Sequence, residues 1–147
     1  MRLSLVPSTD PADYRFVHRI RTRFAETDAM GVIHHGAYAP YLEEARAALL
    51  RSVGNPYDEV RRDGIDFAVL ELFVQYRHPL YFDDQVDIHV AAGKLTRTTF
   101  QVGYLLQVDG EIRSTAVTVH AAVAPDGKGV RMPPWMAGVV AGDPVDR

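Results

Sequence analysis

The chain has 147 residues, of which 47% are hydrophobic and 24% are charged, and its formal charge at pH 7 is −3. This length suits one core that buries roughly two thirds of the unfolded surface, so we expect a single domain over residues 1–147 with its core at about 15–135. No segment reaches the roughly 20 apolar residues of a membrane-spanning helix. The negative charge argues against nucleic acid as a partner.

The composition also restricts the chemistry. The sequence has no cysteine, which excludes disulfides, thiolate nucleophiles and cysteine metal ligands. A nucleophile must therefore be an oxygen or nitrogen atom. Residues 1–10 lack a charged segment followed by an apolar run and a cleavage site, so we expect a cytoplasmic protein.

The first half of the chain predicts one strand and two helices. From Phe16 to Ala25 apolar and arginine side chains alternate, which is typical of a strand with one solvated face. Apolar residues then recur at helical spacing from Tyr38 to Val53 and stop at a glycine. Asn55 as N-cap and Pro56 as first residue predict a short second helix, which Gly64 closes.

The second half predicts four successive strands, because the hydrophobic period changes to two after residue 64. We place them at about 67–78, 85–95, 98–108 and 111–124. The pair Asp109-Gly110 is a signal for a tight hairpin, so the sheet is expected to be antiparallel. Several strands carry apolar residues on both faces, and we expect a helix and a partner subunit to cover them.

The segment between the first strand and the long helix concentrates small, polar and turn-forming residues. Residues 26–38 read Glu-Thr-Asp-Ala-Met-Gly-Val-Ile-His-His-Gly-Ala-Tyr, and residues 43–46 read Glu-Glu-Ala-Arg. This pattern resembles the signature of hotdog thioesterases of the 4-hydroxybenzoyl-CoA type, in which T-D-x-x-G precedes V-[VI]-x-H, a Tyr and an E-x-A-R helix. The similarity extends over about residues 19–135.

The resemblance implies an α+β hotdog fold, an antiparallel β-sheet wrapped around one long α-helix. It implies a homodimer or homotetramer with active sites at the subunit interface. The implied reaction is hydrolysis of an acyl-CoA, or of an acyl-carrier protein thioester, to the free acid and thiol, without a cofactor.

The resemblance also implies two catalytic groups. Asp28 would act as nucleophile or general base, and the backbone amide of His35 would polarise the thioester carbonyl. Unpaired amides at a helix start favour a developing negative charge there. The imidazole of His35 matches a histidine of many members, whereas other members have Tyr. Members often carry Tyr and Asn at two further positions, which are Phe24 and Ala37 here, so the minimal mechanism needs only the carboxylate and the amide.

Residues flanking these two groups complete the predicted site. We expect the substrate to contact Gly31, Val32, Ile33, His34 and Tyr38. Coenzyme A carries phosphates, which cations bind. The candidate cations are Arg77, Lys94 and Arg97, although each also fits a solvated strand face or hairpin.

Other interpretations remain open. Asp28 can be a turn carboxylate that binds local amides. His34 and His35 suggest a metal site, but adjacent histidines rarely converge on one ion and no H-E-x-x-H spacing is present, so we expect no metal. Alternative functions are a non-catalytic hotdog module that binds acyl thioesters and a hotdog hydratase or dehydratase. We assign no chemistry to His18, His78, His89 and His120.

Overall fold

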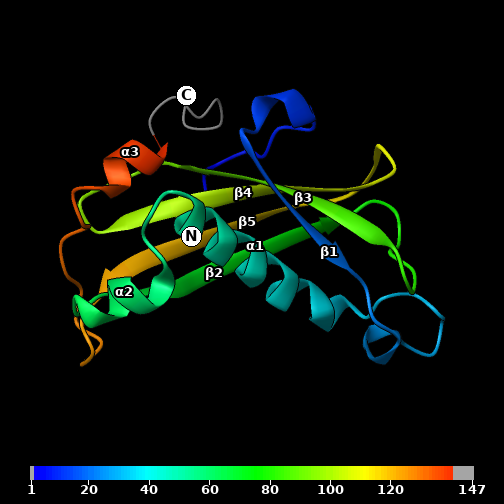
Figure 1. The fold of residues 1–147 in the computed structure, drawn as a ribbon, viewed down its shortest axis with the longest axis horizontal. Coiled ribbons are helices and arrows are strands. Elements are labelled where there is room, and N and C mark those ends of the chain that lie inside the picture. Colours follow the sequence, from blue (N-terminus) through cyan, green and yellow to red (C-terminus); the bar gives the residue numbers. More distant parts are fainter. Residues whose placement is uncertain (1, 141–147) are drawn as a thin grey trace.

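The computed structural model describes residues 2–140 (Figure 1). Its strands are β1 Phe16–Arg21, β2 Asp66–Tyr76, β3 Gln85–Gly93, β4 Thr99–Val108 and β5 Glu111–Val123. Its helices are α1 Tyr38–Ser52, α2 Tyr57–Arg62 and α3 Met136–Val140, and its 3-10 turns are η1 Pro11–Asp13, η2 Phe24–Glu26 and η3 His35–Ala37. The predicted order of one strand, two helices and four strands is confirmed, and α3 is an addition to it.

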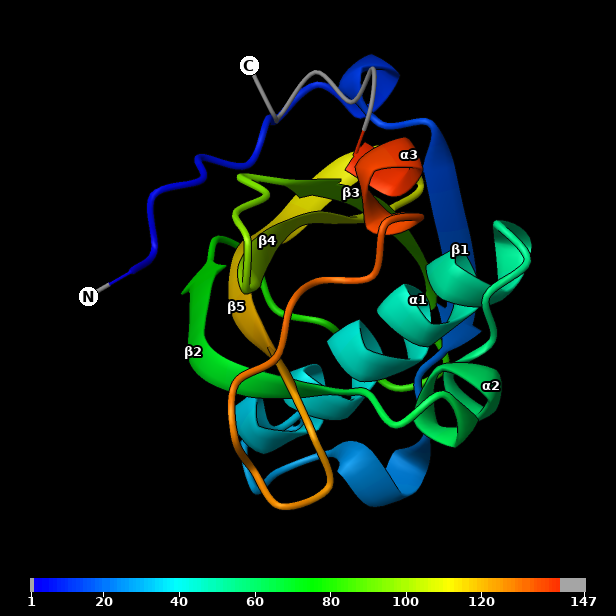
Figure 2. The same cartoon turned by 90° about the vertical axis from the view of Figure 1, so that its left-hand side faces the viewer.

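The five strands form one antiparallel sheet in the order β1-β3-β4-β5-β2. Figure 2 shows this sheet curved around α1. The predicted α+β architecture, an antiparallel sheet wrapped around one long helix, is therefore confirmed. β1 and β2 are the edge strands.

The apolar stripe of α1 faces the sheet. Tyr41, Leu42 and Ala45 are buried there, as the helical spacing predicted. Val53 is an exception, because the helix ends at Ser52 and leaves the Val53 side chain 43% exposed. Gly54 follows with φ +83°, the left-handed conformation that ends helices.

Two predicted boundaries are wrong. β1 ends at Arg21 rather than at Ala25, because the Thr22 hydroxyl and amide bind the carbonyls of Tyr81 and Asp84 in the connection before β3 and the 3-10 turn η2 follows from Phe24. α2 has Pro56 rather than Asn55 as its N-cap. The Asn55 side chain instead donates to the Val53 carbonyl at 3.4 Å.

Part of the sheet's outer face is covered by the N-terminal segment of the same chain. Leu5 and Tyr14 are buried there and pack with Ala91, Leu105 and Val117. Gly103 makes room for this contact, since a Cβ atom at that position would lie 2.8 Å from Leu5 Cδ2. The expectation that only a partner subunit covers this face is thus corrected.

Among residues 2–140 no helix is both long and apolar enough to cross a bilayer. α1, with 15 residues, is shorter than the roughly 20 residues needed.

Candidate active site

The loop between η2 and η3 folds back on itself and against the connection between β2 and β3. The Asp28 amide donates to the Val32 carbonyl at 2.8 Å, and the Gly31 amide donates to the Asp28 carbonyl at 3.0 Å. Gly31 has φ +81°, which an L side chain rarely adopts. The Ile33 amide donates to the Leu80 carbonyl at 2.8 Å. These bonds place Asp28 in a fixed turn directly before the helical segment.

Asp28 has two features that bear on its role. Its Oδ1 accepts hydrogen bonds from the amides of Met30 at 2.8 Å and Val32 at 3.4 Å. This is the local turn function that the sequence left open. The residue also lines a cavity of about 320 Å³, so the same carboxylate is held by its own turn and presented to a space that a ligand can enter.

His35 lines the same cavity as Asp28. It begins η3, which continues directly into α1, so its amide lies one 3-10 turn ahead of the helix rather than at the start of α1 itself. The predicted start of the long helix at Tyr38 is confirmed, and η3 is an additional turn ahead of it. The peptide dipoles of η3 and of α1 add where the two segments follow each other. The His35 amide is therefore at the positive end of the combined dipole.

The two histidine rings have different contacts. His34 Nδ1 accepts a hydrogen bond from the Gly36 amide at 2.8 Å and thereby caps η3. The rings of His34 and His35 stack with centroids 4.1 Å apart. Within the described residues no hydrogen bond joins the His35 ring to Asp28, so the apo geometry leaves the imidazole without a direct link to the carboxylate.

Two tyrosines form the wall opposite the turn. Tyr38 is buried, and burial raises its pKa to about 12. Tyr76 packs edge-on against it with ring centroids 4.9 Å apart. The Tyr76 hydroxyl donates to the His35 carbonyl at 3.4 Å, so the end of β2 supports η3 and hence the orientation of the neighbouring amide.

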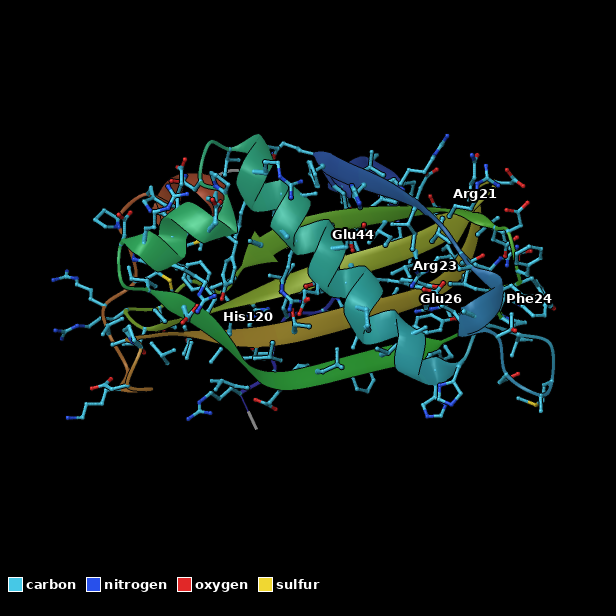
Figure 3. All side chains as sticks on the ribbon, turned by 60° about the horizontal axis from the view of Figure 1, so that its bottom comes forward. Arg21, Arg23, Phe24, Glu26, Glu44 and His120 are labelled. Carbon is cyan, nitrogen blue, oxygen red and sulfur yellow. The ribbon has the colours of Figure 1, made fainter. Side chains whose placement is uncertain are left out.

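Glu26 fixes the other side of the loop. Its carboxylate accepts hydrogen bonds from the Tyr41 hydroxyl at 2.5 Å and from the Arg23 amide at 2.8 Å. Burial opposes ionisation of Glu26, but these bonds together with the Arg23 guanidinium outweigh it and lower the pKa of the carboxyl. Figure 3 shows Arg23 and Glu26 together at this end of α1. The ionised Glu26 ties the loop to the helix.

The predicted substrate contacts are only partly brought together. The cavity is lined by Val32, Ile33 and Tyr38, whereas Gly31 and His34 are not among its lining residues. Gly31 shapes the turn, and His34 caps η3. The lining residues that sequence reasoning missed are Met30, Tyr76, His78 and Pro79. The signal for the last three was their place at or just after the end of the strand predicted at about 67–78.

The three predicted cations are not grouped within one chain. Arg77 lines the cavity of Asp28. Lys94 and Arg97 lie on the β3–β4 connection, next to the end of β5 where Thr99 pairs with Ala121. Tyr76, which lines the cavity of Asp28, pairs with Ser114 at the other end of β5. In one chain Lys94 and Arg97 are therefore at the opposite end of the sheet from this cavity, about 20 Å away along β5.

Phe24 stands where many family members carry Tyr, but its side chain does not lie beside Asp28. Its side chain is 74% exposed, and its ring packs edge-on against Phe82 with centroids 5.7 Å apart. Figure 3 shows it at the outer end of the molecule. Phe24 therefore does not place a buried phenyl ring beside the Asp28 carboxylate. For metals, residues 2–140 hold no group of three or more His, Asp or Glu side chains suited to an ion.

An antiparallel sheet wrapped around one long helix is the architecture of the hotdog fold. Comparison with known proteins gives the same result. Residues 30–122 match the Thioesterase superfamily. The crystal structure of a hypothetical protein from Aquifex aeolicus is 37% identical, covers 85% of this chain and 98% of that chain, and has a TM-score of 0.81.

Two other relatives carry functional names. The DHNA-CoA thioesterase from Staphylococcus aureus is 31% identical, with 78% of each chain covered and a TM-score of 0.76. The 1,4-dihydroxy-2-naphthoyl-CoA hydrolase of Synechococcus elongatus is 31% identical, with 74% of this chain and 80% of that protein covered. The chain belongs to the Thioesterase superfamily and is a thioester hydrolase with the hotdog fold.

Proposed function

We propose that this protein hydrolyses an acyl-CoA to the free acid and coenzyme A. The observation that carries the proposal is the shared cavity of Asp28 and His35 at the helical N-terminus. The thioester carbonyl would accept a hydrogen bond from the His35 amide, which stabilises the negative charge that develops on its oxygen. Such a donor typically contributes a factor of about 10²–10³ in rate.

Asp28 supplies the oxygen chemistry. In one route its free carboxylate oxygen attacks the thioester carbon, the thiolate of coenzyme A leaves, and water hydrolyses the resulting anhydride. In the other route Asp28 takes a proton from the water that attacks. Binding of Oδ1 by two turn amides leaves Oδ2 for either role. Both routes give the same products, so both belong to the proposal.

Coenzyme A is the proposed thiol carrier. Relatives of the chain are named for CoA thioesters, and Arg77 at the cavity offers a guanidinium to a phosphate. An acyl-carrier protein would present the same thioester on a protein surface. Lys94 and Arg97 are not proposed as part of this CoA site, because of their distance along the sheet.

The functional unit is proposed to be a homodimer, or a homotetramer built from it, in which the edges of two β2 strands pair. Within the described residues β2 is paired only with β5, and its outer part carries exposed apolar side chains. These are Val69, Leu70, Leu72, Phe73 and Tyr76. An unpaired apolar edge strand tends to associate with another strand. Since Tyr76 also borders the cavity, a second β2 strand would lie beside the site.

A panel of acyl-CoAs, screened for release of free thiol with enoyl-CoA hydration followed in parallel, tests the proposed function. Thiol release well above the uncatalysed rate for at least one acyl-CoA is expected. Hydration without thiol release would instead identify a hydratase, and binding without either reaction would identify a non-catalytic module. Either result would overturn the proposal.

A further inference from the structure

A second cavity, of about 290 Å³, lies beneath the C-terminal half of α1. Its walls are mainly apolar and aromatic, and they include Leu49, Leu50, Tyr57, Phe67 and Phe100. Ligand sites are typically apolar with a few convergent polar groups. The charged and polar groups here come from Glu43, Arg46 and His120.

His120 is 0% exposed, and its ring stacks on Phe100 with centroids 4.9 Å apart. Its Nε2 lies 2.7 Å from Thr118 Oγ1. Its Nδ1 is buried and has no hydrogen-bond partner among the described residues. The backbone of Phe67 lies close enough to the ring to raise its pKa, but it does not reach ordinary hydrogen-bond geometry with Nδ1. A buried polar atom without a partner costs free energy, which a ligand atom can recover.

The hydrogen-bond chain behind His120 decides whether Nδ1 donates or accepts. Arg46 has only donors and binds the Tyr104 oxygen. Tyr104 and Thr118 oxygens lie 2.8 Å apart. If Tyr104 donates to Thr118, and Thr118 donates to Nε2 of His120, every proton in this buried chain has an acceptor. The reverse direction would leave the Tyr104 proton without one.

His120 Nδ1 therefore carries the proton. Burial and the positive charge of Arg46 lower the pKa of His120 to about 3, so the ring is neutral at ordinary pH and bears a single proton. A neutral ring whose Nε2 accepts must have its N–H at Nδ1. The cavity thus offers one fixed donor to a ligand.

Three separate cavities are each lined by residues of both α1 and β2, and we call the space along these two elements the groove. The first contains Asp28 and Tyr38. A middle cavity of about 220 Å³ begins at Ala39 and shares Glu43, Arg46 and Val69 with the cavity of His120. On β5, His120 pairs with Val69 and Ser114 pairs with Tyr76. The cavity of His120 and the cavity of Asp28 are therefore separated by six residues of β5, or about 20 Å. Figure 3 shows His120 and Glu26 toward opposite ends of α1.

We propose that this groove binds a long acyl chain whose thioester lies at Asp28, and that His120 Nδ1 donates a hydrogen bond to a hydroxyl or carbonyl oxygen near the distal end of that chain. The inference rests on the proposed thioesterase function and adds its substrate class, an oxygenated long-chain acyl thioester. His120 is then a specificity residue that touches the substrate far from the reacting bond.

The test measures the dissociation constants of matched acyl-CoAs by calorimetry, using Asp28→Asn so that the ligands survive. The ligands are palmitoyl-CoA and lauroyl-CoA, each compared with its ω-hydroxy form, and butyryl-CoA. ω-Hydroxypalmitoyl-CoA is expected to bind roughly tenfold more tightly than palmitoyl-CoA, as one buried hydrogen bond allows. The shorter lauroyl pair should show a smaller difference or none.

Variants in the same background assign the effect. His120→Phe should abolish the preference for the hydroxylated chain, whereas His120→Gln, which retains an acceptor for Thr118 and a donor for the ligand, should keep part of it. His89→Phe is the matched control, because His89 is a half-buried strand histidine that packs with Tyr14 instead. The ratio of its dissociation constants for palmitoyl-CoA and ω-hydroxypalmitoyl-CoA should equal that of the Asp28→Asn parent protein.

Several outcomes would overturn the inference. They are equal affinities for the two palmitoyl ligands, a preference that persists in His120→Phe, and no gain for palmitoyl-CoA over butyryl-CoA, which would mean that the groove is filled by a second copy. Failure of the proposed function is distinguishable: the wild type would then release no thiol from any acyl-CoA, while the binding preference remained.

Discussion

Asp28 and His35 enter one cavity from a turn and from a helical start, so their functions can be separated by substitution. Truncation of the His35 side chain leaves its backbone amide in place, and that amide is the proposed donor to the carbonyl oxygen. The variant His35→Ala is therefore expected to lose less than about tenfold in kcat/KM, much less than the Asp28→Asn variant. Steady-state kinetics on one good acyl-CoA provide the comparison.

Equal losses in the two variants would contradict this ranking. The imidazole would then be a principal acid or base, and its lack of a bond to Asp28 in the free protein would have to change when substrate binds.

His120 makes the stability of the fold depend on pH in a defined direction. The pKa of its ring is lowered to about 3 by burial and by Arg46, whereas an unfolded histidine titrates near 6.5. Below about pH 6.5 the unfolded chain therefore binds one proton more than the folded chain. The free energy of unfolding should fall by about 1.4 kcal/mol for each pH unit from there toward pH 3.

Urea unfolding at several pH values, compared between the wild type and His120→Gln, measures this contribution. Carboxylates affect both proteins alike, so the difference in slope isolates His120. Parallel pH profiles would show that the ring titrates normally, and the assignment of a neutral buried ring would fail.

At the scale of elements, the N-terminal segment contributes to the sheet's outer face in a way that can be measured. Leu5 is 1% exposed and packs with Leu105 and Val117. Leu5→Ala should lower the free energy of unfolding by about 2–4 kcal/mol, as is usual when a buried leucine is truncated. Val6→Ala is the control, since Val6 is 80% exposed. Equal midpoints of denaturant unfolding for the two variants would show that the segment is not docked.

Regular elements were predictable because their signals are local. The spacing of Tyr41, Leu42 and Ala45 indicated α1, and Asp109-Gly110, which has φ of 49° and 80°, indicated the β4–β5 hairpin. The end of β1 was not predictable, because it depends on bonds between distant residues such as Thr22 and Tyr81.

In the site, too, the features with a local sequence signal were predictable and those that depend on distant residues were not. The motif around Asp28 located the turn, and its resemblance to known thioesterases supplied the proposed role. The wall formed by Tyr76 and Pro79 and the buried donor of His120 depend on how β2 and β5 lie beside α1. A single histidine in an alternating strand carries no local sign that one of its nitrogens will lack a partner.

At the scale of the whole molecule, the account requires two copies joined at β2. Phe73 is 53% exposed on this edge strand, and a lysine there would place charge in the proposed interface. Phe73→Lys is expected to convert the dimer to a monomer at micromolar concentration, as measured by size exclusion with light scattering. Val17→Lys, at a 50% exposed position on the other edge strand β1, should leave the dimer intact.

Two results would contradict the proposed interface. A wild-type monomer would remove the need for any partner, and an unaffected Phe73→Lys dimer would place the contact elsewhere on the molecule.

The central claim is that the Asp28 carboxylate performs the chemistry of thioester hydrolysis. The most direct test compares thiol release by the wild type, Asp28→Asn and Asp126→Asn on the best acyl-CoA. Asp126 is the matched control, because its carboxylate accepts a bond from the Lys128 amide at 3.0 Å in a turn much like that of Asp28. We predict that Asp28→Asn keeps its fold and oligomer but loses at least about 10² in turnover, since an amide can neither attack nor accept a proton, while Asp126→Asn stays near the wild type. Near wild-type turnover of a folded Asp28→Asn would contradict the account.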